Sequence, residues 1–287
     1  MPEGNSELYP AYRPLSELKQ AMEKQSIITG LVLRCDRQLE LRVSVGGYEG
    51  WIPRGEAVHP DISGSERDIA ILSLVGKRIS FTITDIQVDG AGRPHLVLSR
   101  RAAQEQTLRW LTKNAEVGCI LPAQVKHLAD FGAFVDLGCG VISLVPLENL
   151  SVARAQHPSQ RLSVGQEILV VVTGIDEDRR RFYLSHKELL GTWFQNAADF
   201  APGDTVTGIV RGVMPYGIFV ELTANLSGLA QSREDVSPGD VVTVQIRSIR
   251  PDTRKIKLRI IERQETNPPT KSPRYFITDG LVRDWIY

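Results

Sequence analysis

The feature that most constrains this chain is a repeated signature in which two aromatic residues lie around a glycine and lead into an apolar run. The signature runs from Asp130 to Leu137 and returns from Pro215 to Leu222. Both copies keep the order aromatic, Gly, variable, Phe, Val, acidic, Leu. Intact spacing in a repeat indicates related structural units, which have to be recognised before local elements are assigned. The sequence therefore predicts an array of similar domains.

The composition bounds the class of protein. The 287 residues are enough for two or three small domains. The formal net charge is zero, so a nucleic-acid site has to depend on where charges are placed and not on their sum. The three cysteines form no CxxC pair, and the sequence shows neither a signal peptide nor an apolar run long enough for a membrane helix. We expect a soluble cytoplasmic protein without a membrane partner.

Each unit has the pattern of five short strands. In the segment 39–45, apolar residues alternate with polar ones, which is the period of a half-buried strand. Gly46 and Gly47 follow it as a hairpin turn. The strands predicted in this way are 27–33, 39–45, 48–53, 78–87 and 95–99 in the first unit, 120–127, 132–137, 141–146, 167–175 and 182–185 in the second, and 205–213, 217–222, 227–230, 241–249 and 256–260 in the third.

Two helices and one tail complete the prediction. Apolar residues at spacings of three and four predict a helix over 15–23. Apolar residues that are interspersed with charged ones predict a linker helix over 100–114. The connection between the third and fourth strands is longer in the second unit than in the third, which is typical of a surface loop. The end of the chain holds several aromatic residues, and we expect it to dock on the rest of the protein.

Five strands with a long connection between the third and the fourth predict the OB-fold, a small Greek-key barrel. The predicted fold class is therefore all-β, with three five-stranded OB-fold barrels joined by short helical linkers. The corresponding domains are an N-terminal arm with a short helix (1–25), a first barrel (26–101), a linker helix (102–115), a second barrel (116–190), a third barrel (191–262) and a C-terminal tail (263–287).

The second unit carries the motifs Gly118, Asp130-Phe131-Gly132-Ala133-Phe134-Val135, Val164-Gly165-Gln166-Glu167 and Leu184-Ser185-His186-Lys187. With these motifs it resembles a known family, the S1 RNA-binding domain of bacterial ribosomal protein S1. Several separated motifs fall in the order and spacing of that family between Gly118 and Lys187. The stretch 203–260 resembles a weaker copy, and the stretch 25–99 resembles a degenerate one.

The resemblance implies a face that binds single-stranded RNA through aromatic rings for bases and cations for phosphates. In the first repeat the aromatic positions are Gln38 and Leu41, which predicts that this repeat has lost the face. Pro146 and Gln231 stand where the family has a histidine, and Arg250 stands where it has an aspartate. The implied RNA-binding residues are Phe131, Phe134, Asp176 and Arg181 in the second repeat and Tyr216, Phe219, Gln231 and Lys255 in the third, with Lys126 and Arg211 as candidate groove cations.

Each of these residues has a simpler interpretation. Phe134 and Phe219 are alternatively core residues of their barrels. Strict alternation puts Phe131 and Phe134 on opposite faces, so a shared face requires a twist or bulge at Gly132. The lone basic residues Lys126, Arg211 and Lys255 are alternatively exposed strand residues that do not contact RNA. The basic stretch 179–181 is either a phosphate contact or a solvated hairpin tip, and both tryptophans Trp51 and Trp110 are expected in core or linker packing.

The sequence shows no catalytic or metal-binding pattern. The five histidines have no metal-ligand spacing with each other or with the cysteines. Gly138-Cys139-Gly140 has no following helix and is interpreted as a turn, not a phosphate loop. No nucleophile elbow, zinc-protease motif or P-loop occurs. We expect a protein that is not an enzyme and has no cofactor.

The leading hypothesis is a non-catalytic single-stranded RNA-binding protein that acts in translation. In this hypothesis the first repeat docks on the small ribosomal subunit or on another protein. The alternatives are a protein-interaction scaffold and an RNA-binding accessory subunit of an RNA-processing or degradation complex. The discriminating feature is whether Phe131, Phe134, Tyr216 and Phe219 are exposed beside basic residues.

Overall fold

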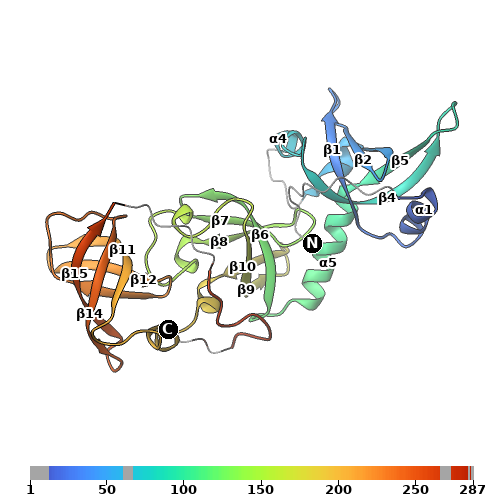
Figure 1. Cartoon of the computed structure of the whole chain (residues 1–287). Helices are drawn as coiled ribbons and strands as arrows, with labels where there is room; N and C mark the ends of the chain where they lie inside the picture. Colours follow the sequence, from blue (N-terminus) through green and yellow to red (C-terminus); the bar gives the residue numbers. More distant parts are fainter. Residues whose placement is uncertain (1–12, 61–66, 266–272, 284, 286–287) are drawn as a thin grey trace.

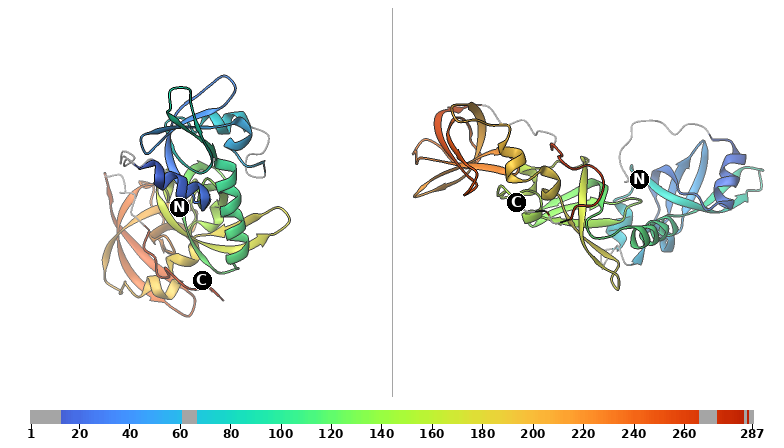
Figure 2. Two further views of the ribbon diagram at one scale, coloured as in Figure 1. Left: turned by 90° about the vertical axis from the view of Figure 1, so that its right-hand side faces the viewer. Right: turned by 90° about the horizontal axis from the view of Figure 1, so that it is seen from below.

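The structure is a computed structural model that describes residues 13–60, 67–265, 273–283 and 285. Three closed five-stranded barrels follow one another along the chain, with the second barrel between the first and the third (Figures 1 and 2). This confirms the predicted all-β class with three OB-fold barrels. No helix in the described part of the chain is long and apolar enough to cross a membrane.

The first barrel is built from β1 (Ile28–Cys35), β2 (Leu41–Val45), β3 (Tyr48–Ile52), β4 (Arg78–Val88) and β5 (Pro94–Ser99). Its strand order is β1-β2-β3-β5-β4, and β1 closes the sheet by pairing with β4 as well. The helix α1 (Leu15–Glu23) has the predicted bounds and buries Leu18 in the core of this barrel. Two short helices, α2 (Arg54–Ala57) and α4 (Arg67–Leu72), lie in the connection from β3 to β4.

The other two barrels have the same strand order. The second consists of β6 (Ile120–Ala129), β7 (Gly132–Asp136), β8 (Ile142–Pro146), β9 (Glu167–Asp176) and β10 (Arg181–Ser185), with short 3-10 turns η1 (Leu147–Asn149) and η2 (Pro158–Gln160) between β8 and β9. The third consists of β11 (Thr205–Met214), β12 (Gly217–Thr223), β13 (Leu226–Ala230), β14 (Val241–Arg250) and β15 (Lys255–Gln264). Between them lie η3 (Lys187–Leu190) and α6 (Trp193–Ala197).

Alternation along the strands gives each barrel an apolar interior. On β15, Ile256, Leu258 and Ile260 are buried in the core of the third barrel, and the residues between them point outward. Each barrel has one apolar cluster of this kind, and none of the three clusters shares residues with another. Burial of these apolar faces is the main favourable term in folding. The core of each barrel is therefore complete without its neighbours.

The linker helix α5 (Arg100–Asn114) joins the first and second barrels and has the predicted bounds. The Ser99 hydroxyl caps it by accepting from the Ala102 amide at 2.9 Å. The buried Gln104 side chain accepts from the His59 amide at 2.8 Å and donates to the Gly140 carbonyl at 3.1 Å, so one side chain contacts both barrels. Trp110 lies on the same helix but is exposed, so the prediction that it packs in the linker is wrong.

The β9–β10 hairpin also contacts this helix. The Arg180 guanidinium forms an ion pair with Glu105 of α5 at 2.8 Å. The tip of the hairpin is therefore not simply a solvated stretch, since one of its three arginines holds the second barrel against the linker helix.

The long connection between β8 and β9 packs on the third barrel. The Val152 amide donates to Asn225 Oδ1 at 3.0 Å, and the Ala153 amide donates to the Ala224 carbonyl at 3.1 Å. Asn225 in turn donates through its amide nitrogen to the carbonyls of Lys187 and Gly191. We expect the connection between β8 and β9 on the surface from the sequence, but it lies in the interface between the second and third barrels.

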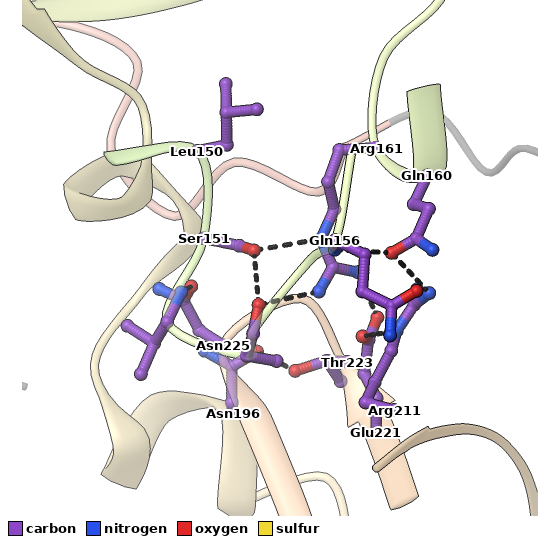
Figure 3. Close-up of polar contacts among 12 residues, drawn as sticks. Leu150, Ser151, Gln156, Gln160, Arg161, Asn196, Arg211, Glu221, Thr223 and Asn225 are labelled. Atoms are coloured by element: carbon purple, nitrogen blue, oxygen red, sulfur yellow. Dashed lines mark hydrogen bonds and ion pairs between the residues drawn. The ribbon is translucent and has the colours of Figure 1, made fainter. Parts of the chain in front are cut away.

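The centre of this interface is a buried ion-pair network. Figure 3 shows Arg161 of the loop and Arg211 of β11 converging on the carboxylate of Glu221. The three side chains are only 7%, 9% and 7% exposed, respectively. Arg161 also donates to Ser151 Oγ and to the Ala153 carbonyl, each at 2.8 Å. Buried charges of this kind are tolerated only when they are paired and hydrogen-bonded.

The C-terminal tail docks on the second barrel. The Tyr275 hydroxyl accepts from the Leu169 amide at 3.0 Å, and the Phe276 amide donates to the Leu189 carbonyl at 2.8 Å. Further along, the Val282 amide donates to the Gly118 carbonyl at 2.8 Å. This agrees with the expected docking of the aromatic tail, although Tyr287 lies outside the described residues.

A fully buried histidine lies under the tail. Nδ1 of His186 is 2.9 Å from the Leu150 carbonyl, so it carries the proton, and Nε2 accepts from the Tyr275 hydroxyl at 3.2 Å. Burial lowers the pKa of His186 to about 4. The folded protein therefore keeps this imidazole neutral and uses both of its nitrogens.

We expect the free energy of unfolding to fall as the pH drops from about 6.5 to about 4. The unfolded chain binds a proton at His186 with the ordinary pKa, whereas the folded chain does not, so acid favours the unfolded state in this window. The loss between about pH 7 and about pH 5 is about 2 kcal/mol. Urea unfolding at the two pH values measures it. His186→Gln should flatten the dependence, and an unchanged slope in that variant would contradict the assignment to His186.

We expect Glu221→Gln to destabilise the protein by about 3 kcal/mol, because it leaves two buried guanidinium groups without their counter-charge. Thermal and urea unfolding measure the loss, and the third barrel should unfold in a separate, earlier transition. Glu234→Gln is the matched control, since Glu234 is exposed beside the same barrel. Equal stability of the two variants would show that the network does not couple the barrels.

Candidate nucleic-acid interface

Strand register on the second barrel brings four side chains into a row on its outer surface. Residues directly opposite each other on neighbouring strands project to the same face of a sheet. Phe134 on β7 lies opposite His127 on β6 and Leu144 on β8, and Leu144 lies opposite Tyr183 on β10. We call His127, Phe134, Leu144 and Tyr183 the outer row of this barrel.

The rings of this row are accessible and close together. The Phe134 ring lies 6.0 Å from the His127 ring at an interplanar angle of 30°, and 5.8 Å from the Phe131 ring at 86°. Phe131 and Tyr183 are 60% and 56% exposed. The neighbours of Phe134 on its strand, Ala133 and Val135, fill the core instead. The alternative that Phe134 is a core residue is therefore wrong.

The turn before β7 explains how Phe131 and Phe134 share a face. Phe131 lies in the turn before β7, where its carbonyl accepts from the Leu147 amide at 2.9 Å. A Cβ atom at Gly132 would lie 2.5 Å from the Val145 carbonyl oxygen, which is too close for any other residue type. Gly132 therefore permits the close approach of β7 to β8, but the register shift lies on β6 and not at Gly132. Phe131 precedes β7, so alternation within the strand does not set its side, and its ring reaches Phe134 from the turn.

The third barrel repeats this geometry with a different composition. Its outer row consists of Gly212, Phe219, Leu229 and Lys257, which are paired across β11, β12, β13 and β15 in the same way. Tyr216 is exposed, and its ring lies 6.1 Å from that of Phe219 at 88°. A lysine thus stands where the second barrel has Tyr183.

Strand β15 extends this row into a basic surface. Lys255, Lys257 and Arg259 are exposed and alternate with core residues, and Arg250 lies opposite Lys255 on β14. We call these four residues the basic strand surface. Within the described ranges, none of the four forms an ion pair, so their charges are free to attract phosphate groups.

Two of the predicted cations do not belong to either row. Lys126 and Arg211 both sit in a bulge of the first strand, where the register shifts by one residue. Lys126 Nζ lies 2.7 Å from Gln124 Oε1 and 3.7 Å from Asp136 Oδ2. Arg211 is buried against Glu221. The prediction of Arg211 as a groove cation is therefore corrected, because its charge is neutralised at the interface between barrels.

The remaining predicted residues lie at the rims. Asp176 and Arg181 face each other across the β9–β10 hairpin, and Asp176 Oδ1 accepts from the Arg179 amide at 2.9 Å. Arg181 is exposed. Gln231 is exposed directly after β13, in the position that Pro146 has at the end of β8. Their roles in RNA binding stay predictions.

Among the residues of the outer rows that carry a ring or a charge, three were not predicted from the sequence. Tyr183 and Lys257 join the rows through parallel pairing between strands that are distant in the chain, and His127 joins its row through the register shift in the β6–β7 hairpin. The local signal for Tyr183 was its place between the core residues Phe182 and Leu184. Alternation shows that such a residue points outward, but only the register shows which residue lies beside it.

The first barrel requires a correction of the aligned positions. Leu41 was placed where the other repeats have their second aromatic residue, but it is fully buried in the core. The residue that lies at the Phe134 position in the register is Arg42, which pairs with Trp51 on β3. Trp51 is accordingly half-buried on the outer surface, and its prediction as a core or linker residue is wrong.

The described chain shows no group of three or more histidine, cysteine or acidic side chains that could hold a metal ion.

The fold and the rows together define a class of protein, an array of OB-fold barrels with aromatic and basic outer surfaces. A family model described as the S1 RNA binding domain matches residues 114–187.

Comparison with known proteins shows which family the chain is similar to. The chain is 36% identical to the small ribosomal subunit protein bS1 homolog of Bacillus subtilis over 54% of its own length and 41% of the relative's. It is 31% identical to the small ribosomal subunit protein bS1 of Neisseria meningitidis over 76% of its own length and 38% of the relative's. The chain is thus similar to the S1 family, through the domain matched at residues 114–187 and through relatives of which it spans about two fifths of the length.

One solved structure shows a more distant likeness. It is a multidomain protein with nucleic acid binding domains from Streptococcus pneumoniae, with 16% identity over 84% of this chain and 74% of that chain and a TM-score of 0.27. This likeness is too weak to bear on fold or function.

We expect Gly217→Ala to destabilise the third barrel by about 3 kcal/mol, through backbone strain and overpacking. Gly217 has φ +147°, and an added Cβ would lie 2.5 Å from the Ala230 carbonyl oxygen. Gly239→Ala is the matched control, because Gly239 has φ +99° but no atom within 4 Å of an added Cβ. It should cost only about 1 kcal/mol. Urea unfolding compares the two, and equal losses would refute the role of close strand approach.

Proposed function

We propose that this chain is a non-catalytic protein that binds single-stranded RNA on the outer rows of its second and third barrels. The observation that carries the proposal is the row of accessible rings around Phe134, together with the unpaired cations of the basic strand surface. Aromatic rings that stack on bases and cations that follow the backbone are the two parts of such a site.

The two barrels divide these tasks. Rings dominate the outer row of the second barrel, whereas the third barrel adds four cations around Phe219 and Tyr216. Bases in a duplex are already stacked and shielded, so rings of this kind favour an unpaired strand. Both barrels thus offer groups suited to an unpaired strand, with stacking dominant on the second barrel and phosphate contact on the third.

The relatives support a role in translation. Both curated relatives are named as small ribosomal subunit proteins, and the similarity to one of them extends over three quarters of this chain. We propose that the protein acts in the cytoplasm and holds messenger RNA at the small ribosomal subunit. The scaffold alternative explains less, because it gives no reason for rings and free cations to share one surface.

The test is fluorescence anisotropy with a labelled unstructured RNA oligomer, against a duplex of equal length, over a salt titration. Phe134→Ala with Tyr183→Ala should weaken single-strand binding at least about tenfold, because each stacked base contributes about 1–3 kcal/mol. The dependence of affinity on salt should stay the same, since neither ring carries charge.

Trp110→Ala is the control for this test, because it removes an exposed aromatic ring that lies outside the outer rows. Circular dichroism checks that each variant is folded. Folded wild-type protein that does not bind the oligomer at low salt would reject the RNA proposal and favour the scaffold.

A further inference from the structure

The first barrel has the same register as the other two, including the bulge in its first strand. In β1 the register shifts between Val32 and Arg34, as it does in β6 between Val125 and His127. Directly after this shift, Arg34 has the position in the first barrel that His127 has in the second. Its partner Arg42 has the position of Phe134. The outer row of the first barrel is therefore Arg34, Arg42, Trp51 and Val97.

The side chains of this row form a cation–ring pair. The guanidinium carbon of Arg42 lies 5.9 Å from the centre of the Trp51 ring. Arg34 is exposed on the neighbouring strand. Over the residues that the structure describes, neither arginine forms an ion pair. This contrasts with Arg211, whose charge is neutralised inside an interface.

We infer that the outer row of the first barrel is a third binding site for single-stranded RNA, in which Arg42 and Trp51 replace the aromatic rings of the other barrels. A guanidinium plane stacks on a base as an aromatic ring does, and it donates to phosphate at the same time. The base stacks on the Arg42–Trp51 pair, and Arg34 contacts the adjacent phosphate. The inference rests on the proposed function for the identity of the ligand.

The chemistry of the row favours RNA over a protein ligand. Two unpaired guanidinium groups beside an indole match a polyanion with flat bases, whereas an apolar protein surface would leave both charges without a partner. Glu49 is the acidic neighbour on β3, two residues before Trp51 and therefore on the same face of the strand. Its carboxylate lies at the edge of the site, and replacing it by an amide tests how a negative charge there affects RNA binding.

The test uses the full chain and an unstructured oligouridine. Trp51→Phe removes the fluorescence of Trp51 alone, so the difference in emission between the wild-type protein and this variant reports on Trp51. That difference should be quenched as RNA is added. Arg34→Ala with Arg42→Ala should weaken binding about tenfold and lower the salt slope by about 1.4, which corresponds to two phosphate contacts at about 0.7 each. Glu49→Gln should strengthen binding.

Arg37→Ala is the matched control, because Arg37 is exposed in the turn after β1 but does not belong to the outer row. It should leave affinity and slope unchanged. If wild-type protein binds RNA while the double arginine variant keeps its affinity and slope and Trp51 is not quenched, only this inference is overturned. If wild-type protein does not bind RNA at all, the proposed function fails and this inference fails with it.

Discussion

The constraint on which this structure depends is closure of each five-stranded sheet. In a closed barrel every residue of a strand faces either the core or the outside, and no free edge allows the register to slip. Phe182 and Leu184 are held inside by this rule, and Tyr183 between them is held outside. Closure also fixes which strands are neighbours, so β8 and β10 meet although a long loop and another strand separate them in the chain.

Polar contacts, and not apolar cores, join the barrels. Gln104 bridges the first two barrels through backbone amide and carbonyl groups, and Glu221 receives arginines from the second and third. Each barrel already has a complete core, so little apolar surface remains to be shared. Because buried polar groups are costly when a partner is missing, such interfaces favour one relative arrangement. The same contacts explain the long loop after β8, whose Arg161 reaches the third barrel.

One scaffold thus presents three different outer surfaces. The register places Arg42, Phe134 and Phe219 at the same position of the first, second and third barrels. The backbone is constant, whereas the side chains are an arginine over an indole in the first barrel, rings in the second, and rings with cations in the third. Function in such arrays depends on the side chains grafted on the fold and not on the fold alone.

The architecture could be predicted from the sequence, because the repeated signature, the alternating strands and the helices over 15–23 and 100–114 all follow from local patterns of apolar residues. The sequence also singled out Phe131 and Phe134, because Gly132 between them marks a special backbone position. The register could not be predicted in this way, and it places Arg42 and not Leu41 on the outer row. The tertiary structure also decided which cations stay free, since Arg211 is neutralised by a network that reaches a loop far away in the chain. The physical reason is that alternation is a property of a single strand, whereas pairing and charge neutralisation depend on segments that meet only when the barrels close and pack.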